Sequence, residues 1–174
     1  MLLTTERLVL RRFRASDQEA FAAYRNDPEI ARYQGWGTVT TAADFSRGEP
    51  DEPGWFQYAV ELVAERQLIG DVGVNTHENR MQASIGYTLA AAHHGRGYAT
   101  EAVRAILDHL FRVRGLHKVS AECDARNTAS ARLLTRVGFT QEGHLRSHTW
   151  IRNEWTDDLL FGLLATEWLG DGAR

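Results

Sequence analysis

The chain has 174 residues, a length that suits one domain and is too short for two ordinary ones. Apolar residues make up 43% and charged residues 25%, which is typical of a globular protein and excludes a disordered one. The formal net charge of −3 gives no reason to expect a nucleic-acid or membrane partner. We therefore expect one domain over residues 1–174.

Residue usage also indicates the compartment. The single cysteine, Cys123, cannot form a disulfide within the chain, which fits a reducing environment. Glu6 and Arg7 stand where a signal peptide would have its apolar core, and no apolar run approaches transmembrane length. No histidine pair has the helical spacing of a metal site, so we expect no metal. These features predict a cytoplasmic protein.

The first third of the chain predicts a strand followed by helices. Apolar and polar residues alternate over residues 5–13, as in a half-buried strand. Ser16 and Glu19 have the spacing of a capping box and predict the start of a helix that residues 26–28 end. Residues 34–54 are irregular, with one helical turn expected over residues 41–45.

The remaining elements alternate between strands and helices. Strands are expected at residues 55–63, 68–75, 83–89, 118–124, 140–145 and 150–164, and helices at residues 100–114 and 127–136. The first three of these strands form an antiparallel meander. This order predicts an α/β (mixed α+β) fold, with one mostly antiparallel mixed sheet and helices on both faces.

A glycine turn joins the strand that ends at Leu89 to the helix that follows. Gly95 and Gly97 flank Arg96, and the small residues let backbone N–H groups converge beside the donors of the helix start. This arrangement predicts a phosphate-sized anion site, although a tight turn that needs positive φ explains the same residues. The turn has neither the Gly-Lys-Ser/Thr ending of a Walker loop nor the spacing of a dinucleotide fingerprint.

Several short motifs together give the chain a family resemblance. It resembles the GNAT N-acetyltransferases, and within them the RimJ/RimL-like branch that acetylates protein N-termini. The motifs that carry the resemblance are residues 5–11, 26–29, 85–87, 95–102, 127–130 and 138–139. The likeness implies the GNAT fold, in which two neighbouring strands splay apart to hold acetyl-CoA.

The resemblance also implies where acetyl-CoA binds. Backbone N–H groups of the glycine loop would bind the pyrophosphate, the splayed strand would bind the pantetheine arm, and an asparagine would touch that arm. The residues so assigned are Tyr87, Leu89, Ala91, His94, Gly95, Arg96, Gly97, Tyr98, Ala99, Thr100 and Asn127. Two positions depart from the family: His94 replaces the usual Gln or Arg, and Leu134 replaces a tyrosine that many members use as an acid.

Direct attack of an amine on the thioester needs an acid for the leaving thiolate and a base for the amine. For the acid we favour Ser130, one helical turn after Asn127, with a serine bonded to its own backbone as the alternative. For the base we favour Glu122, with a structural glutamate as the alternative; His148 is a poorer candidate because the histidines follow no pattern. Cys123 should face away from Glu122 and be inert.

The acceptor is an amine whose identity the sequence leaves open. Trp36, Trp55 and Phe56 are expected to line its pocket, with Trp150 as a further candidate, although large aromatics also fill cores. The branch favours a protein or peptide N-terminus, and a polyamine or aminoglycoside is the rival. A non-catalytic coenzyme A sensor is the alternative that Leu134 keeps open. A homodimer through the last strands is left open without a residue-level argument.

Overall fold

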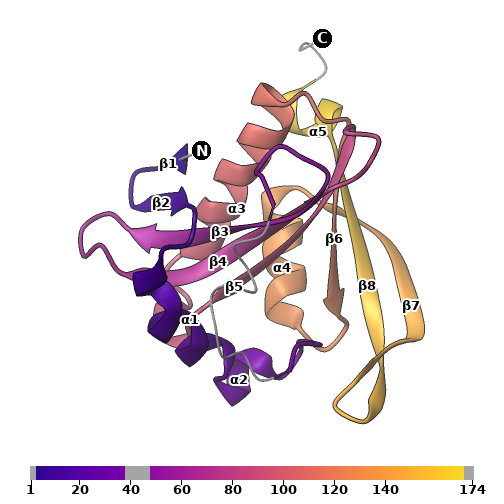
Figure 1. Ribbon diagram of the computed structural model, residues 1–174. Helices are drawn as coiled ribbons and strands as arrows, with labels where there is room; N and C mark the ends of the chain where they lie inside the picture. Colours follow the sequence, from indigo (N-terminus) through magenta and orange to yellow (C-terminus); the bar gives the residue numbers. More distant parts are fainter. Residues whose placement is uncertain (1–2, 38–47, 171–174) are drawn as a thin grey trace.

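The protein is described here by a computed structural model that covers residues 3–37 and 48–170 (Figure 1). Its described residues form one eight-stranded sheet in the order β1-β2-β3-β4-β5-β6-β8-β7. The strands are β1 (Leu3–Thr4), β2 (Leu8–Arg11), β3 (Gly54–Leu62), β4 (Leu68–Thr76), β5 (Gln82–Leu89), β6 (Lys118–Asp124), β7 (Thr140–Ile151) and β8 (Glu154–Leu164). The β5–β6 pair is parallel and the other neighbours are antiparallel, which confirms a mostly antiparallel mixed sheet.

Helices cover both faces of this sheet, as predicted (Figure 1). Alternation along β3 shows why: Tyr58 and Val60 belong to the main core together with α3 and α4, whereas Ala59 packs with Phe21 of α1 on the opposite face. The helices are α1 (Gln18–Arg25), α2 (Pro28–Ala31), α3 (Tyr98–Asp108), α4 (Thr128–Val137) and α5 (Ala165–Leu169), and short 3₁₀ or π turns span Ala15–Asp17, Ala91–His93 and His109–Val113. No helix in the described ranges is long and apolar enough to span a bilayer.

The start of α1 differs from the sequence prediction. Ser16 does not cap the helix; a 3₁₀ turn precedes α1, and the Asp17 carboxylate accepts the backbone N–H of Arg14 at 2.7 Å. The reason is tertiary, because Asp17 is drawn inward to pair with Arg11. Helix α3 begins at Tyr98, two residues before its predicted start. The helical turn expected over residues 41–45 lies outside the described residues.

The final hairpin also differs from its prediction. The turn lies at Arg152 and Asn153, both with positive φ (48° and 64°), and not between residues 145 and 150. Strand β7 continues to Ile151 because an irregularity between Leu145 and Thr149, with Ser147 at φ 48°, bends the strand without ending it. The polar residues that suggested a loop therefore belong to a bulged strand.

A buried ion cluster ties α1 to the sheet. The Arg11 guanidinium of β2 donates to Asp17 (2.7 and 2.9 Å) and to Glu61 of β3 (2.7 Å), and the side chains of Arg11 and Asp17 are 5% and 7% exposed. Burial favours the neutral carboxyl, but the hydrogen bonds from Arg11 and Arg14 outweigh it and hold the pKa of Asp17 below its usual value.

Replacing Asp17 should therefore destabilise the fold in a pH-dependent way. We expect Asp17→Asn to lower the free energy of unfolding at pH 7 by about 3 kcal/mol, since Arg11 loses one of two buried carboxylates. Because the folded pKa of Asp17 is lowered, its contribution is present above about pH 4 and fades as the pH falls through the folded pKa. Urea unfolding at several pH values measures both effects.

The matched control is Glu52→Gln, which breaks the exposed Glu52–Arg80 pair, whose side chains are 55% and 56% exposed. That change should cost no more than about 0.5 kcal/mol. Equal losses in the two variants, or a deficit of Asp17→Asn that persists unchanged at pH 2, would contradict the role of the buried cluster.

Candidate active site

The sheet opens between β5 and β6. The two strands pair only over four positions, from Gln82–Lys118 to Ile85–Ala121. Beyond them, β5 stays bound to β4 as far as Leu89, and β6 stays bound to β8 as far as Asp124. The facing edges therefore diverge, which confirms the predicted splayed pair. Backbone N–H and C=O groups along these edges are left to bind something other than each other.

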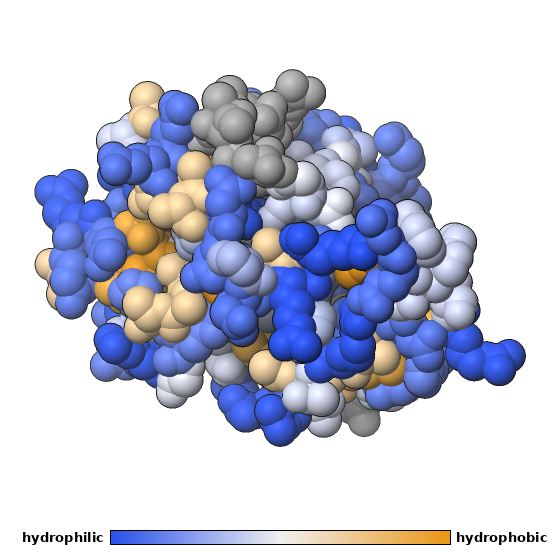
Figure 2. All heavy atoms as spheres, turned by 90° about the horizontal axis from the view of Figure 1, so that it is seen from below, coloured by the Kyte–Doolittle hydropathy of each residue, from blue (hydrophilic) through white to orange (hydrophobic). Residues whose placement is uncertain are grey.

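A cavity of about 850 Å³ occupies this opening. Tyr33 and Trp36 line it on the side of α1 and α2, and Ser130 and Leu134 line it on the side of α4, so it reaches both faces of the sheet. In Figure 1, α2, the free end of α4 and the tip of the β7–β8 hairpin lie at the same end of the molecule. Seen from that end, the surface is mostly hydrophilic, with smaller apolar areas between the hydrophilic ones, most of them in the left half of the view (Figure 2).

The glycine loop forms one end of the cavity. Gly95 and Gly97 have positive φ (73° and 82°), so the tight turn does require glycine at both positions. Gly97 is also the N-cap of the 11-residue helix α3, whose first-turn N–H groups have no acceptor within the helix. Gly95, Gly97 and the residues of that first turn, Tyr98, Ala99 and Thr100, line the cavity. The loop thus offers both features of an anion site, glycine backbone and helix N-terminus.

Two side chains hold this loop in place. Arg7 donates to the carbonyl of Arg96 (3.0 Å), stacks over the Tyr98 ring (4.5 Å to its centre) and pairs with Glu101 (2.6 Å). His94 bonds the carbonyl of Leu89 (2.9 Å), so its ring fastens the loop to the end of β5. The sequence assigned Arg7 no function, although it lies within the N-terminal motif that supports the resemblance.

Glu101 completes the link between Arg7 and α3. Its carboxylate accepts the Thr5 hydroxyl (2.6 Å) and the backbone N–H of Arg7 (3.0 Å). Burial favours the neutral carboxyl, but these hydrogen bonds and the Arg7 guanidinium outweigh it and keep the pKa of Glu101 below its usual value. An ionised Glu101 therefore anchors the N-terminal segment to the first turn of α3.

On the α4 side of the sheet, three polar side chains meet. The Tyr87 hydroxyl lies 2.8 Å from Ser130 Oγ, and the Cys123 thiol is close enough to Ser130 for the serine to act on its pKa. Burial is the main cause that raises the pKa of Tyr87, and burial likewise raises the pKa of Cys123 to about 11. Both groups are therefore protonated near neutral pH. Leu134, in the position of the family tyrosine, is buried beside them.

Asn127 organises the start of α4. Its Oδ1 accepts the backbone N–H of Ser130 at 3.1 Å, so the asparagine caps the helix that carries the serine. The hydroxyl of Thr135, also in α4, donates a hydrogen bond to the backbone carbonyl of Ala131 (3.0 Å). The Ser130 hydroxyl instead meets Tyr87.

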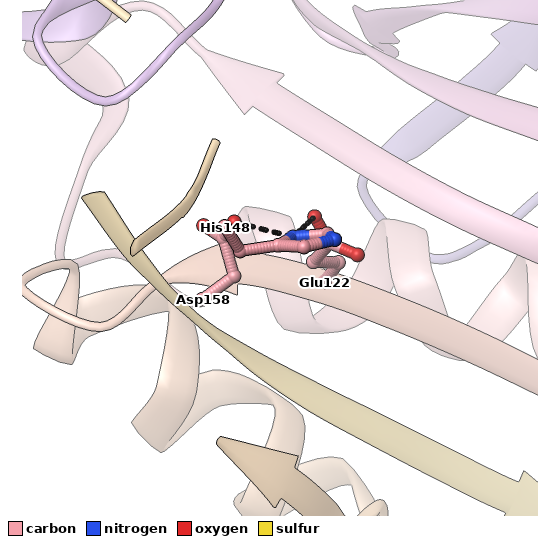
Figure 3. A group of neighbouring side chains, drawn as sticks. All are labelled: Glu122, His148 and Asp158. Carbon is pink, nitrogen blue, oxygen red and sulfur yellow. Dashed lines mark hydrogen bonds and ion pairs between the residues drawn. The ribbon is translucent and has the colours of Figure 1, made fainter. Parts of the chain in front are cut away.

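On the opposite face, Glu122 lies beside two groups from the last hairpin (Figure 3). His148 Nδ1 is 2.9 Å from Asp158 Oδ2 and 3.8 Å from Glu122 Oε1. Burial, and next the charge of Asp158, raise the pKa of Glu122, while His148 opposes the shift. Sequence reasoning ranked His148 low because the contact depends on the bulge in β7, which no sequence spacing reveals.

The aromatic residues predicted to line an acceptor pocket separate into two groups. Trp36 and Trp55 line the cavity. Phe56 does not: it is 3% exposed and packs edge-on against Tyr58 in the main core, because neighbours on a strand face opposite ways. Trp150 is exposed and packs against Trp155 at the end of the final hairpin, so it is not a lining residue.

A buried carboxylate beneath Trp36 also escaped the sequence analysis. Asp71 of β4 is 1% exposed and accepts hydrogen bonds from Arg25 (2.6 Å), Gln57 (2.6 Å) and the Tyr24 hydroxyl. The Arg25 guanidinium in turn lies 4.0 Å from the centre of the Trp36 ring. This network fixes the cavity wall formed by α1 and β4, and only the packing of α1 on the sheet brings it together.

Comparison with known proteins agrees with this geometry. The model of the acetyltransferase (GNAT) domain matches residues 7–140. The uncharacterized N-acetyltransferase p20 of Bacillus licheniformis is 31% identical, with 97% of this chain and 98% of that protein covered. The [ribosomal protein uS5]-alanine N-acetyltransferase of Escherichia coli is 28% identical, with 56% of this chain and 53% of that protein covered.

A solved structure shows the same fold. It is a chimera of the spermidine N-acetyltransferase SpeG from Vibrio cholerae and hSSAT, with a TM-score of 0.81, 22% identity, and 94% of this chain and 98% of that chain covered. The family match agrees with the geometry, which has an opened sheet and a glycine loop at a helix start. The similarity to known N-acetyltransferases is consistent with the RimJ/RimL-like branch. The chain belongs to the GNAT family of acetyl-CoA-dependent N-acetyltransferases.

Proposed function

We propose that this protein transfers the acetyl group of acetyl-CoA to the α-amino group of a protein or peptide. The observation that supports this most is the cavity that crosses the sheet between β5 and β6, with hydroxyl groups on one face and a carboxylate on the other. Acetyl transfer needs these two kinds of group on opposite sides of the reacting carbonyl, because one proton is delivered to sulfur and another is taken from nitrogen.

The glycine loop and the open strand edge would hold acetyl-CoA. N–H groups of Gly97, Tyr98 and the next residues of α3 suit the pyrophosphate, since they combine free donors with the positive end of the helix. The edge of β5 from Tyr87 to Leu89 is open and suits the amide groups of the pantetheine arm, which would pair with it as a neighbouring strand would. A backbone N–H near Leu89 polarises the thioester carbonyl.

The chemical step is direct attack. The amine nitrogen forms a bond to the carbonyl carbon of the thioester, and the carbon–sulfur bond breaks. The Ser130 hydroxyl, which Tyr87 holds at 2.8 Å, donates a proton to the departing sulfur and takes the place of the tyrosine that Leu134 replaces. Glu122 takes a proton from the amine, directly or through a water, and its raised pKa suits a base.

The charges around the acceptor side favour a single amine over a polyamine. Among the lining residues that the structure describes, the carboxylates are Glu29, Asp71, Glu122 and Asp124. Asp71 is engaged by Arg25 and Asp124 by Arg126, at 2.6 and 2.7 Å. A polyamine would need several carboxylates for its repeated cations, whereas an α-amino group needs one. Trp36 and Trp55 would pack against the first side chains of a peptide.

The test is release of coenzyme A thiol from acetyl-CoA in the presence of N-terminal peptides, spermidine or an aminoglycoside. We expect release with peptides, and we expect Ser130→Ala to lower kcat about 100-fold with unchanged affinity for coenzyme A. Thr135→Ala, which removes a hydroxyl bonded to the backbone of the same helix, is the control and should keep its activity. Release with spermidine alone would support the small-amine reading, and binding without any release would support the sensor.

The structure also predicts a role for Arg7 in binding coenzyme A. Arg7→Met keeps most of the aliphatic stem but removes the bonds to Arg96 and Glu101, which should leave the loop less ordered. We expect the Kd for coenzyme A, measured by calorimetry, to rise about tenfold, or about 1.4 kcal/mol. The control is Arg12→Met, because the Arg12 side chain is 43% exposed, like that of Arg7, and its hydrogen bonds go to Gly48 and Glu49 instead of the glycine loop. Equal affinities in the two variants would contradict the role of Arg7.

A further inference from the structure

We propose that His148 and Asp158 form a proton exit behind Glu122, through which the proton taken from the acceptor amine reaches solvent. This inference rests on the proposed acetyl transfer and assigns functions to two residues of the last hairpin. His148 is on the bulged part of β7 and Asp158 on β8, and both side chains meet Glu122 of β6 (Figure 3). One ring nitrogen of His148 and one oxygen of each of the two carboxylates lie within 4.8 Å of one another.

Asp158 determines how the imidazole is held. The side chain of Asp158 is 7% exposed, and its Oδ2 accepts hydrogen bonds from His148 Nδ1 (2.9 Å) and the Thr149 hydroxyl (2.5 Å). A carboxylate only accepts, so Nδ1 carries the hydrogen and the second ring nitrogen, Nε2, keeps its lone pair. A buried carboxylate that orients a histidine in this way also stabilises the charged imidazolium.

The position of the pair relative to the cavity fits an exit. Glu122 lines the cavity, but neither His148 nor Asp158 does, so the pair lies behind Glu122. The side chain of His148 is 45% exposed and therefore reaches solvent on the hairpin. An acceptor seated in the cavity would cover the cavity side of Glu122 and leave the histidine side open. The atom of His148 nearest to Glu122 is the protonated Nδ1, at 3.8 Å, so the proton cannot pass to it directly. The relay then runs from the amine to the Glu122 carboxylate, from there through a bridging water to the lone pair of Nε2 of His148, and from the imidazolium to solvent.

Other charged groups nearby have partners of their own. On β6, Asp124 is paired with Arg126 (2.7 Å), and on β8 Asp157 binds His144 (2.9 Å) and the backbone N–H of Ser147 (2.8 Å). In the described ranges, the charges that act on Glu122 are those of Asp158, which raises its pKa, and His148, which lowers it. The titration of Glu122 therefore reports on both members of the pair, with opposite signs.

This opposition provides the test. We would measure kcat/KM against pH for wild type, His148→Gln and Asp158→Asn with the acceptor that the thiol-release assay identifies. The acid limb of this profile reports the pKa of the general base, Glu122. Removing His148 removes the charge that lowers the pKa of Glu122, so the limb should move to higher pH. Removing Asp158 removes the charge that raises it, so the limb should move to lower pH. We also expect kcat to fall about tenfold or more in both variants.

The matched control is His144→Gln. His144 and Asp157 form a pair on the same hairpin with the same 2.9 Å distance, whereas the histidine that approaches Glu122 is His148. This variant should keep the wild-type profile. Exogenous imidazole should restore turnover to His148→Ala, which a packing role would not permit. Melting temperatures and coenzyme A affinity confirm that each variant is folded.

The possible failures are distinguishable. If wild type and His144→Gln turn over and His148→Gln shows the same pH profile, the exit is wrong and the acetyltransferase proposal stands. Shifts of the acid limb in one direction in both variants would also overturn the exit. If wild type binds coenzyme A but acetylates no acceptor, the proposed function and the exit fail together.

Discussion

The fold depends on one short parallel pairing. Strands β5 and β6 share four paired positions and then separate, although each remains bound to its outer neighbour. A backbone edge inside a protein has to find hydrogen-bond partners, and here an extended ligand with amide groups can provide them. The glycine loop follows β5 directly, so the anion site and the open edge belong to one continuous segment. The arrangement of the cavity follows from the point at which pairing stops.

The opening also separates two kinds of proton chemistry. Because side chains alternate along a strand, adjacent residues of β6 face opposite sides of the sheet. Cys123 contacts Ser130 on the α4 side, with Tyr87 of β5, and Glu122 meets His148 and Asp158 on the other side. In the proposed reaction, the hydroxyl side serves the sulfur and the carboxylate side serves the amine. An acid and a base can then work in one site without neutralising each other.

Much of this arrangement could be predicted from the sequence because it depends on local signals. The meander, the glycine turn and the α4 cap follow from alternation, glycine spacing and the Asn127–Ser130 pair, which act over a few residues. The family resemblance then identified the splayed pair. The prediction was wrong where a tertiary contact overrides a local pattern: Ser16 does not form the expected helix cap because Asp17 is drawn inward to Arg11, and Phe56 turns to the core while Trp55 faces the cavity.

The sequence by itself determined the family, the order of strands and helices, and the loop that suits a pyrophosphate. Only the tertiary structure decided which distant side chains share the site. Arg7 meets Glu101 across 94 positions, and Tyr87 meets Ser130 across 43. His148 reaches Asp158 through a bulge that was not predicted and a turn that was predicted in the wrong place. The physical reason is that contacts between elements depend on register and on bulges, and a shift of one residue in a strand moves every side chain to the other face.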